Sequence, residues 1–213
     1  MTAGAMAIWL LLAQAGSVAR AGRFEISGAA IWTGGYDAGG QPALETRNPS
    51  TGSSPLTLFT VDSRLVAAPG VEARLGLYLS RRLLVEGSLQ FSRPVLRSHL
   101  AADFESAADT DAEATIASYT IAGSALYHFG RGRLRPFVKA GGGYVRELLE
   151  DNAAVVTGAE VHTGGGLRCA LTKSAHPLWL RVDGAVSVRE KAVAFDRKQK
   201  IVPQLAGGLS WRF

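Results

Sequence analysis

The sequence predicts an all-β protein, an eight-stranded antiparallel up-and-down transmembrane β-barrel preceded by a cleaved signal peptide. Apolar and polar residues alternate with a period of two in eight segments of ten to thirteen residues, and no window after residue 22 keeps the apolar stripe of a helix. These segments exceed the roughly five or six residues usual in soluble sheets and match the roughly 9 to 11 that cross a bilayer at a tilt. The connections between them alternate between short and long.

The eight predicted strands are residues 24–33, 71–80, 83–92, 117–129, 135–145, 160–172, 178–189 and 201–213. The short connections are 81–82, 130–134 and 173–177, and the long ones are 34–70, 93–116, 146–159 and 190–200. In outer-membrane barrels the short turns face the periplasm and the long loops face outside. An even number of strands lets the last strand pair with the first, so that no edge stays unpaired in lipid. Part of the first loop, LTLFTVDSRLV at 56–66, is expected to continue a strand beyond the membrane.

The N-terminus is predicted to be a signal peptide, residues 1–21, which leaves residues 22–213 as the barrel. Its apolar run, AMAIWLLLAQAG at 5–16, is too short for a membrane-spanning helix of about 20 residues. Ala19-Arg20-Ala21 has the small-x-small pattern of a signal peptidase site. A buried N-terminal helix is the alternative, because MTAGAM carries no Lys or Arg.

Composition disfavours two classes of function, redox chemistry and binding to nucleic acid. The single cysteine, Cys169, cannot form an internal disulfide. The net charge of +5 and the pI near 9.7 arise from Lys and Arg spread along the chain without a basic run, which disfavours binding to nucleic acid. The four histidines lie on separate segments without metal-ligand spacing. The sequence therefore predicts no metal site and no cofactor.

One face of the predicted strands is apolar and is expected to face lipid. Given the strand directions, its aromatic residues fall into two bands that bracket aliphatic residues, as in the aromatic girdles of membrane barrels. The periplasmic band contains Phe24, Tyr127, Phe129, Trp211 and Phe213, and the outer band contains Trp32, Phe91, Tyr119 and Tyr144. A soluble core has no reason to sort its aromatic residues by depth.

The opposite face is rich in charge and is expected to fill the lumen. A barrel of eight strands is only wide enough for its own side chains, and five acids against six bases allow pairing across it. The predicted lumen charge network contains Glu25, Glu72, Arg74, Glu86, Lys139, Glu160, His162, Arg168, Arg181 and Asp183; Arg189 and Arg212 share its face. Tyr78, Phe137 and Trp179 are expected to form an apolar plug near the periplasmic end.

A soluble, lipocalin-like barrel is the alternative, because it shows the same alternation with the apolar face turned inward. Such a protein would place the charged residues of the other face in water. Partitioning with detergent separates the two hypotheses, since a lipid-facing barrel follows the detergent.

With these patterns, the chain resembles the small outer-membrane barrels related to the OmpA transmembrane domain and OmpX. The ending GGLSWRF is similar to the C-terminal signal strand of that family, with Gly207, Leu209, Trp211 and Phe213 in the matching spacing. The resemblance implies that the barrel-assembly machinery recognises this strand. The Gly-rich segment RPFVKAGGGYV is also similar to strands of the family. A periplasmic domain after the barrel is not expected.

The leading functional hypothesis is a monomeric, non-enzymatic barrel of the bacterial outer membrane, in contact with membrane lipid and lipopolysaccharide. It would have a structural role or present its loops to an unknown extracellular partner. A narrow porin-like channel is the alternative. A lipid A-modifying enzyme is disfavoured because no nucleophile, base and orienting group are seen to converge. No catalytic residue is predicted, and His162 is expected to pair with Glu160 or another carboxylate in the lumen.

Overall fold

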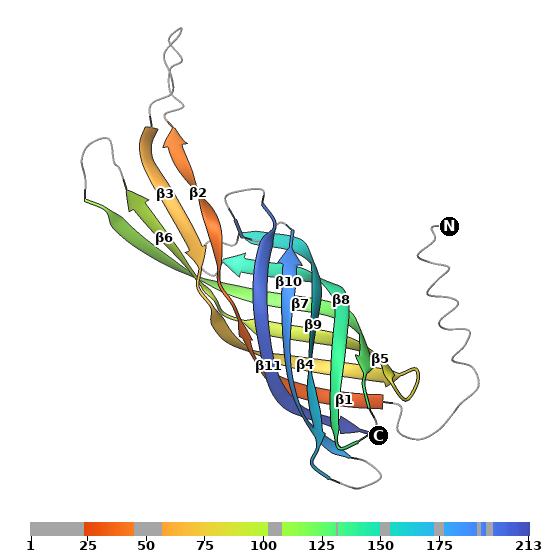
Figure 1. Cartoon of the computed structure of the whole chain (residues 1–213). Helices are drawn as coiled ribbons and strands as arrows, with labels where there is room; N and C mark the ends of the chain where they lie inside the picture. The colour runs from red at the N-terminus through yellow and green to blue at the C-terminus, as the bar shows by residue number, and fades with distance from the viewer. Residues whose placement is uncertain are drawn as a thin grey trace, which may run out of the picture.

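The computed structural model describes residues 24–44, 57–101, 108–130, 132–149, 154–172, 177–190, 193–194 and 198–213. Eight strands form a closed antiparallel ring in the order β7, β5, β4, β1, β11, β10, β9, β8 and back to β7 (Figure 1). They are β1 (Phe24–Thr33), β4 (Ala68–Tyr78), β5 (Leu83–Ser92), β7 (Thr110–His128), β8 (Leu134–Leu149), β9 (Val155–Ala170), β10 (Leu178–Arg189) and β11 (Lys200–Arg212). The predicted eight-stranded up-and-down barrel is confirmed.

The ring closes where the last strand pairs with the first. β1 and β11 are antiparallel from Glu25 opposite Arg212 to Thr33 opposite Gln204. Phe24 and Phe213 exchange both backbone hydrogen bonds, with N···O distances of 3.2 and 3.0 Å. The described residues contain no helix of the length and hydropathy that crossing a membrane requires. The predicted signal peptide, residues 1–21, lies outside the described residues.

Three strands reach at least four residues farther toward the long connections than predicted, because their pairing continues beyond the alternation that marks the membrane. β7 begins at residue 110 instead of 117, β8 ends at 149 instead of 145, and β9 begins at 155 instead of 160. The extension of β8 and β9 is a regular hairpin that reaches Leu148 opposite Val155. Residues 146–149 are therefore strand, whereas the sequence predicted a loop.

The connections predicted as loops at 34–70 and 93–116 contain three further strands, β2 (Tyr36–Leu44), β3 (Thr57–Leu65) and β6 (Val95–Ala101). Together with residues 110–115 of β7 they form a second antiparallel sheet, which we call the rim sheet. It projects beyond the ring in Figure 1. The prediction that 56–66 continue a strand is confirmed for 57–65, and residue 56 lies outside the described residues. β2 and β6 were not predicted.

The rim sheet is the continuation of one half of the barrel wall. Its order, β2–β3–β6–β7, repeats the order β1–β4–β5–β7 of the ring, and residues 34–35, 66–67 and 93–94 join the two levels. Glycine is required at the first joint, because a Cβ on Gly35 would lie 2.3 Å from the carbonyl oxygen of Leu65. At the third joint Pro94 has no N–H to donate to a ladder.

Burial follows the period of two around the ring and separates its two faces. The outward face exposes aliphatic side chains such as Leu75, Val161 and Ile201, each about two-thirds exposed. The inward face buries charged side chains such as Arg168, Arg181 and Asp183. This arrangement is inverted relative to a soluble protein, and it suits a wall surrounded by lipid.

Candidate functional site

The lower end of the lumen, beside the short turns, is filled by a small apolar cluster and a buried ion pair. The cluster consists of Tyr78, Leu84, Leu126 and Phe137. Arg168 pairs with Glu25 across the barrel, and its guanidinium also donates to the Tyr78 hydroxyl at 2.5 Å and to Ser210 at 2.8 Å. Arg135 and Arg168 lie over the ring of the buried Trp179.

The middle of the lumen holds a connected network of charges centred on Asp183. Its carboxylate contacts Arg74 at 3.0 Å, Arg181 at 3.1 Å and Lys139 at 2.5 Å. Arg181 also binds Glu86 at 2.5 and 3.2 Å, and Arg74 pairs with Glu72. The carboxylate of Glu72 in turn accepts a hydrogen bond from Gln90 at 3.1 Å. These partners come from β4, β5, β8 and β10, so the network ties opposite walls of the barrel together.

The upper lumen contains a second ion-pair group that the sequence predicted only in part. Arg189 binds Glu160 at 3.0 Å and Glu147 at 3.5 Å. Glu147 also accepts a hydrogen bond from the backbone N–H of Val193 at 2.8 Å. Glu147 was missed because it lies in the residues predicted as a loop, where the inward parity was not followed.

A histidine and a serine meet beside this group. The Nε2 atom of His162 lies 2.8 Å from Ser124 Oγ, and its Nδ1 atom lies 3.7 Å from Glu160 Oε1. Gly141 stands between Ser124 and His162 in the register, and a Cβ there would lie 2.8 Å from His162 Nε2. The sequence analysis did not consider Ser124, so this contact between a hydroxyl and an imidazole was not predicted.

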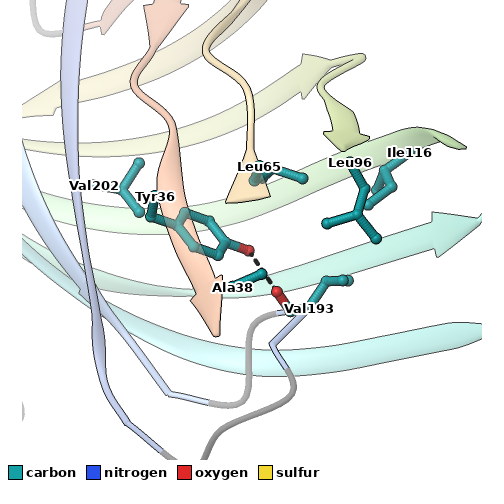
Figure 2. Packing of buried hydrophobic residues seen from close by; sticks show 7 residues of the cluster. All are labelled: Tyr36, Ala38, Leu65, Leu96, Ile116, Val193 and Val202. Carbon is teal, nitrogen blue, oxygen red and sulfur yellow. Dashed lines mark hydrogen bonds between the residues drawn. The ribbon is translucent and has the colours of Figure 1, made fainter. Parts of the chain in front are cut away.

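A second apolar cluster, shown in Figure 2, lies at the end of the lumen next to the rim sheet. It contains Tyr36, Ala38, Leu65, Leu96, Ile116, Val193 and Val202, with Leu149 and Val156 packed against it. Side chains of the rim sheet thus meet side chains of the ring and of the β10–β11 connection. Burial raises the pKa of Tyr36, so its hydroxyl stays protonated and donates to the Val193 carbonyl at 3.3 Å.

The outward face of the rim sheet is charged, in contrast to the apolar wall below it. Alternate residues of its four strands place Asp37, Asp62, Arg64, Arg97, His99, Asp111 and Glu113 on this face, all exposed. These side chains line a hollow of about 970 Å³. Arg97 binds Glu113 at 2.7 Å, and His99 binds Asp111 at 2.7 Å.

The comparisons with known proteins place the fold. No family model and no curated protein matches the chain. The outer membrane protein OprG from Pseudomonas aeruginosa is similar at a TM-score of 0.51 and 12% identity, over 91% of this chain and 97% of that one. Neisserial surface protein A is similar at a TM-score of 0.47 and 14% identity, over 89% of this chain and 97% of that one. The attachment invasion locus protein Ail of Yersinia pestis is similar at a TM-score of 0.45 and 10% identity, over 90% of this chain and 99% of that one. The chain has the fold of an integral outer-membrane β-barrel.

In this barrel, the residues predicted for the lumen all lie on the inward face. Nine of the ten are buried, and Lys139 is partly buried. The structure brings them into three groups: a lower pair, Glu25 and Arg168; the central network of Glu72, Arg74, Glu86, Lys139, Arg181 and Asp183; and an upper pair, Glu160 and His162. The described residues hold no group of three or more His, Cys, Asp or Glu side chains placed to bind a metal ion.

The aromatic residues predicted for the girdles lie on the outward face of the barrel. Eight are exposed, and Phe91 is partly exposed beside Tyr119, with ring centroids 5.0 Å apart. At the lower end Phe24 stacks on Phe213 at 6.3 Å, and Trp211 lies 5.7 Å from Phe213. Gly207 and Leu209 of the predicted assembly signal are also exposed on β11.

The rim sheet is expected to respond to pH through His99. The hydrogen bond to Asp111 raises the pKa of His99 above its ordinary value of 6.5, and the charges of Asp111, Asp109 and Asp62 act in the same direction. A raised pKa in the folded state means that this contribution to stability is complete below the unfolded-state pKa and is lost as the pH rises through the folded-state pKa. The protection of the β6 amides from hydrogen exchange, relative to the intrinsic exchange rate at each pH, should therefore fall over that window.

The Asp111→Asn variant is the control for this prediction. It removes the charged acceptor, so an NMR titration of the imidazole should show the pKa of His99 moving back toward 6.5. An imidazole that titrates identically in both proteins would show that the contact with Asp111 does not set the pKa.

Proposed function

We propose that this protein is a closed outer-membrane barrel with a structural and surface-interaction role, which holds the rim sheet outside the membrane. The observation that carries the proposal is the filling of the lumen. An apolar cluster lies at each end, and buried ion pairs occupy the space between them. Eight strands leave little lumen space beyond their own side chains, and these side chains are held by partners on opposite walls.

The rim sheet is the element best placed for surface contacts. It continues four strands of a rigid scaffold, and scaffolds that hold exposed elements in place are common carriers of recognition surfaces. Its inward side closes the mouth through Tyr36, Leu65 and Leu96, so its outward side is available for partners. We also propose a monomer, because the ring leaves no unpaired edge within the membrane, and recognition of β11 by the barrel-assembly machinery.

Single-channel recording in planar bilayers tests the closed lumen. The unmodified protein is expected to insert without stable conductance steps. The double variant Tyr36→Ala, Leu96→Ala removes two large side chains of the outer cluster, and brief openings should become more frequent. Tyr144→Ala, which trims an exposed tyrosine of the outward wall, is the matched control and should stay silent. Stable conductance of the unmodified barrel would contradict the proposal.

A narrow channel is the second candidate, favoured by polar groups in the lumen. Among the described residues, the buried Ser27 Oγ and Gln204 Nε2 atoms have no hydrogen-bond partner in the protein, and buried polar groups of this kind are commonly satisfied by water. Lys139 and Gln90 are only partly buried. Water in the middle of the lumen would become a conductive path only if both apolar clusters opened.

An enzyme that modifies lipid A is the least favoured candidate. Ser124 and His162 have the separation of a nucleophile and base, but they face the lumen, whereas the acyl chains of a lipid lie against the outer wall. The carboxylate that would orient His162 is already bound by Arg189 at 3.0 Å and lies 3.7 Å from the imidazole. We therefore assign these three groups to the filling of the lumen.

A further inference from the structure

The hollow on the outward face of the rim sheet contains an arginine without an ion-pair partner among the described residues. Arg64 lies between Asp37, which is opposite it in the β2–β3 register, and Arg97, which is opposite it in the β3–β6 register. Like charges directly opposite one another, as in Arg64 and Arg97, destabilise a sheet. Arg97 is bound by Glu113 at 2.7 Å. Within the described part of the chain, Arg64 makes no hydrogen bond or ion pair, although it lines the hollow. An anion seated between the two guanidinium groups would relieve this repulsion.

The acids around the hollow limit what it can hold. Glu113 is bound to Arg97, Asp111 is bound to His99, and Asp37 accepts a hydrogen bond from the backbone N–H of Gly39 at 2.7 Å. Asp62 lies in the next row outward, opposite His99. The arginines can therefore attract one compact anionic group, while Asp62 and Asp37 repel a long polyanion. A phosphate monoester fits this pattern, since arginine binds phosphate oxygens with paired N–H donors.

The height of the hollow indicates where such a group would come from. Glu113 lies six residues beyond Tyr119 of the outer aromatic band along β7, which is about 20 Å along a strand and roughly 15 Å above the band at the usual tilt. The hollow also faces away from the barrel axis. It therefore lies at the level of the sugars that crown the lipids of the outer leaflet.

We propose that this hollow binds one phosphate group on the sugar headgroup of the outer-leaflet glycolipid, with Arg64 and Arg97 as the donors. The proposal rests on the proposed orientation, in which the rim sheet lies outside the membrane. It adds a specific lipid contact to the surface role. Arg64 supplies the guanidinium that has no protein partner among the described residues, and Arg97 supplies the donors that Glu113 leaves free.

The test is a binding titration of the full chain in neutral detergent with lipopolysaccharide that carries phosphorylated core sugars. The same lipopolysaccharide after chemical removal of the phosphate monoesters is the second probe. Arg64→Gln is expected to weaken binding of the phosphorylated probe about tenfold. Arg146→Gln is the matched control, because Arg146 is exposed on the outward face of β8 and outside the hollow, and its binding should be unchanged. The dephosphorylated probe should bind the unmodified protein as weakly as the phosphorylated probe binds the variant.

Three results would overturn the proposal. Equal affinity of Arg64→Gln and the unmodified protein would exclude the site, and an equal loss in Arg146→Gln would reduce it to general attraction between charges. Competition by inorganic phosphate at the affinity of the glycolipid would make it a site for a free anion. Gel migration with and without boiling is recorded for every variant, so that failure of the barrel to fold is distinguished from failure to bind.

Discussion

Replacing Asp183 by Asn is expected to lower the stability of the folded barrel by about 3–5 kcal/mol, the usual cost of removing one partner from a buried ion pair. Asp183 is 2% exposed, and its side chain contacts Arg74, Arg181 and Lys139. An amide of the same shape leaves three cations in the lumen with one carboxylate fewer. Urea titration of the protein in lipid vesicles, followed by tryptophan fluorescence and gel migration, measures the change.

Asp62→Asn is the matched control, because it makes the same substitution at an exposed position of the rim sheet. It should change the stability by less than about 0.5 kcal/mol. A loss below about 1 kcal/mol for Asp183→Asn would mean that water screens the central charges, as in a wide aqueous lumen. That result would favour the channel.

Replacing Val182 by Arg is expected to cost about 2–4 kcal/mol, the penalty for a cation on the lipid-facing wall near the middle of the bilayer. Val182 is 55% exposed and lies near the middle of β10, on its outward face. If water instead of lipid surrounded this outward wall, arginine would be tolerated at the same position. Unfolding titrations in vesicles of defined lipid provide the measurement.

Val155→Arg is the companion variant, because the expected depth in the membrane is the main difference between the positions of Val155 and Val182. Val155 is 47% exposed on the same kind of outward face, but it lies at the start of β9, opposite Leu148 and beyond the predicted membrane segment. Its expected cost is about 0–1 kcal/mol. Equal costs at the two positions would contradict the depth assigned to the membrane.

The architecture of the ring could be predicted because side-chain parity is a local property of a strand. Each wall residue lies inward or outward according to its position along its own strand, so the burial of Arg74, Arg181 and Asp183 followed from alternation alone. The count of alternating segments supplied the number of strands, and the match of their length to the bilayer indicated a membrane barrel. None of this required knowledge of which strands meet across the lumen.

The partners within the lumen could not be predicted in the same way. The contact of Ser124 with His162 depends on the register of β7, β8 and β9 and on the missing side chain of Gly141. Glu147 was overlooked because the alternation was not followed past residue 145, although the strand continues. A pattern read along one strand does not contain the register between strands.

The rim sheet was missed for a different reason. Gly34, Gly35 and Pro94 are typical of turns, and the sequence therefore predicted that the chain leaves the sheet there. In the structure these residues bend strands that continue. The segment 36–44 also contains Gly39, Gly40 and Pro42, which are unfavourable in a strand. Pairing with β3 overrides this local preference.

The lipid-facing orientation of the apolar wall is tested most directly by the direction in which β10 turns its two faces. Spin labels at Val182 and Val186 are compared with labels at Ala185 and Ser187, in a background with Cys169→Ser, after reconstitution into vesicles. The first pair is exposed and the second pair is buried toward the lumen. In a lipid-facing barrel, oxygen dissolved in the lipid should broaden the spectra of the first pair strongly and those of the second pair weakly. Access of the first pair to an aqueous relaxation agent, with the second pair in an apolar interior, would instead show a soluble barrel.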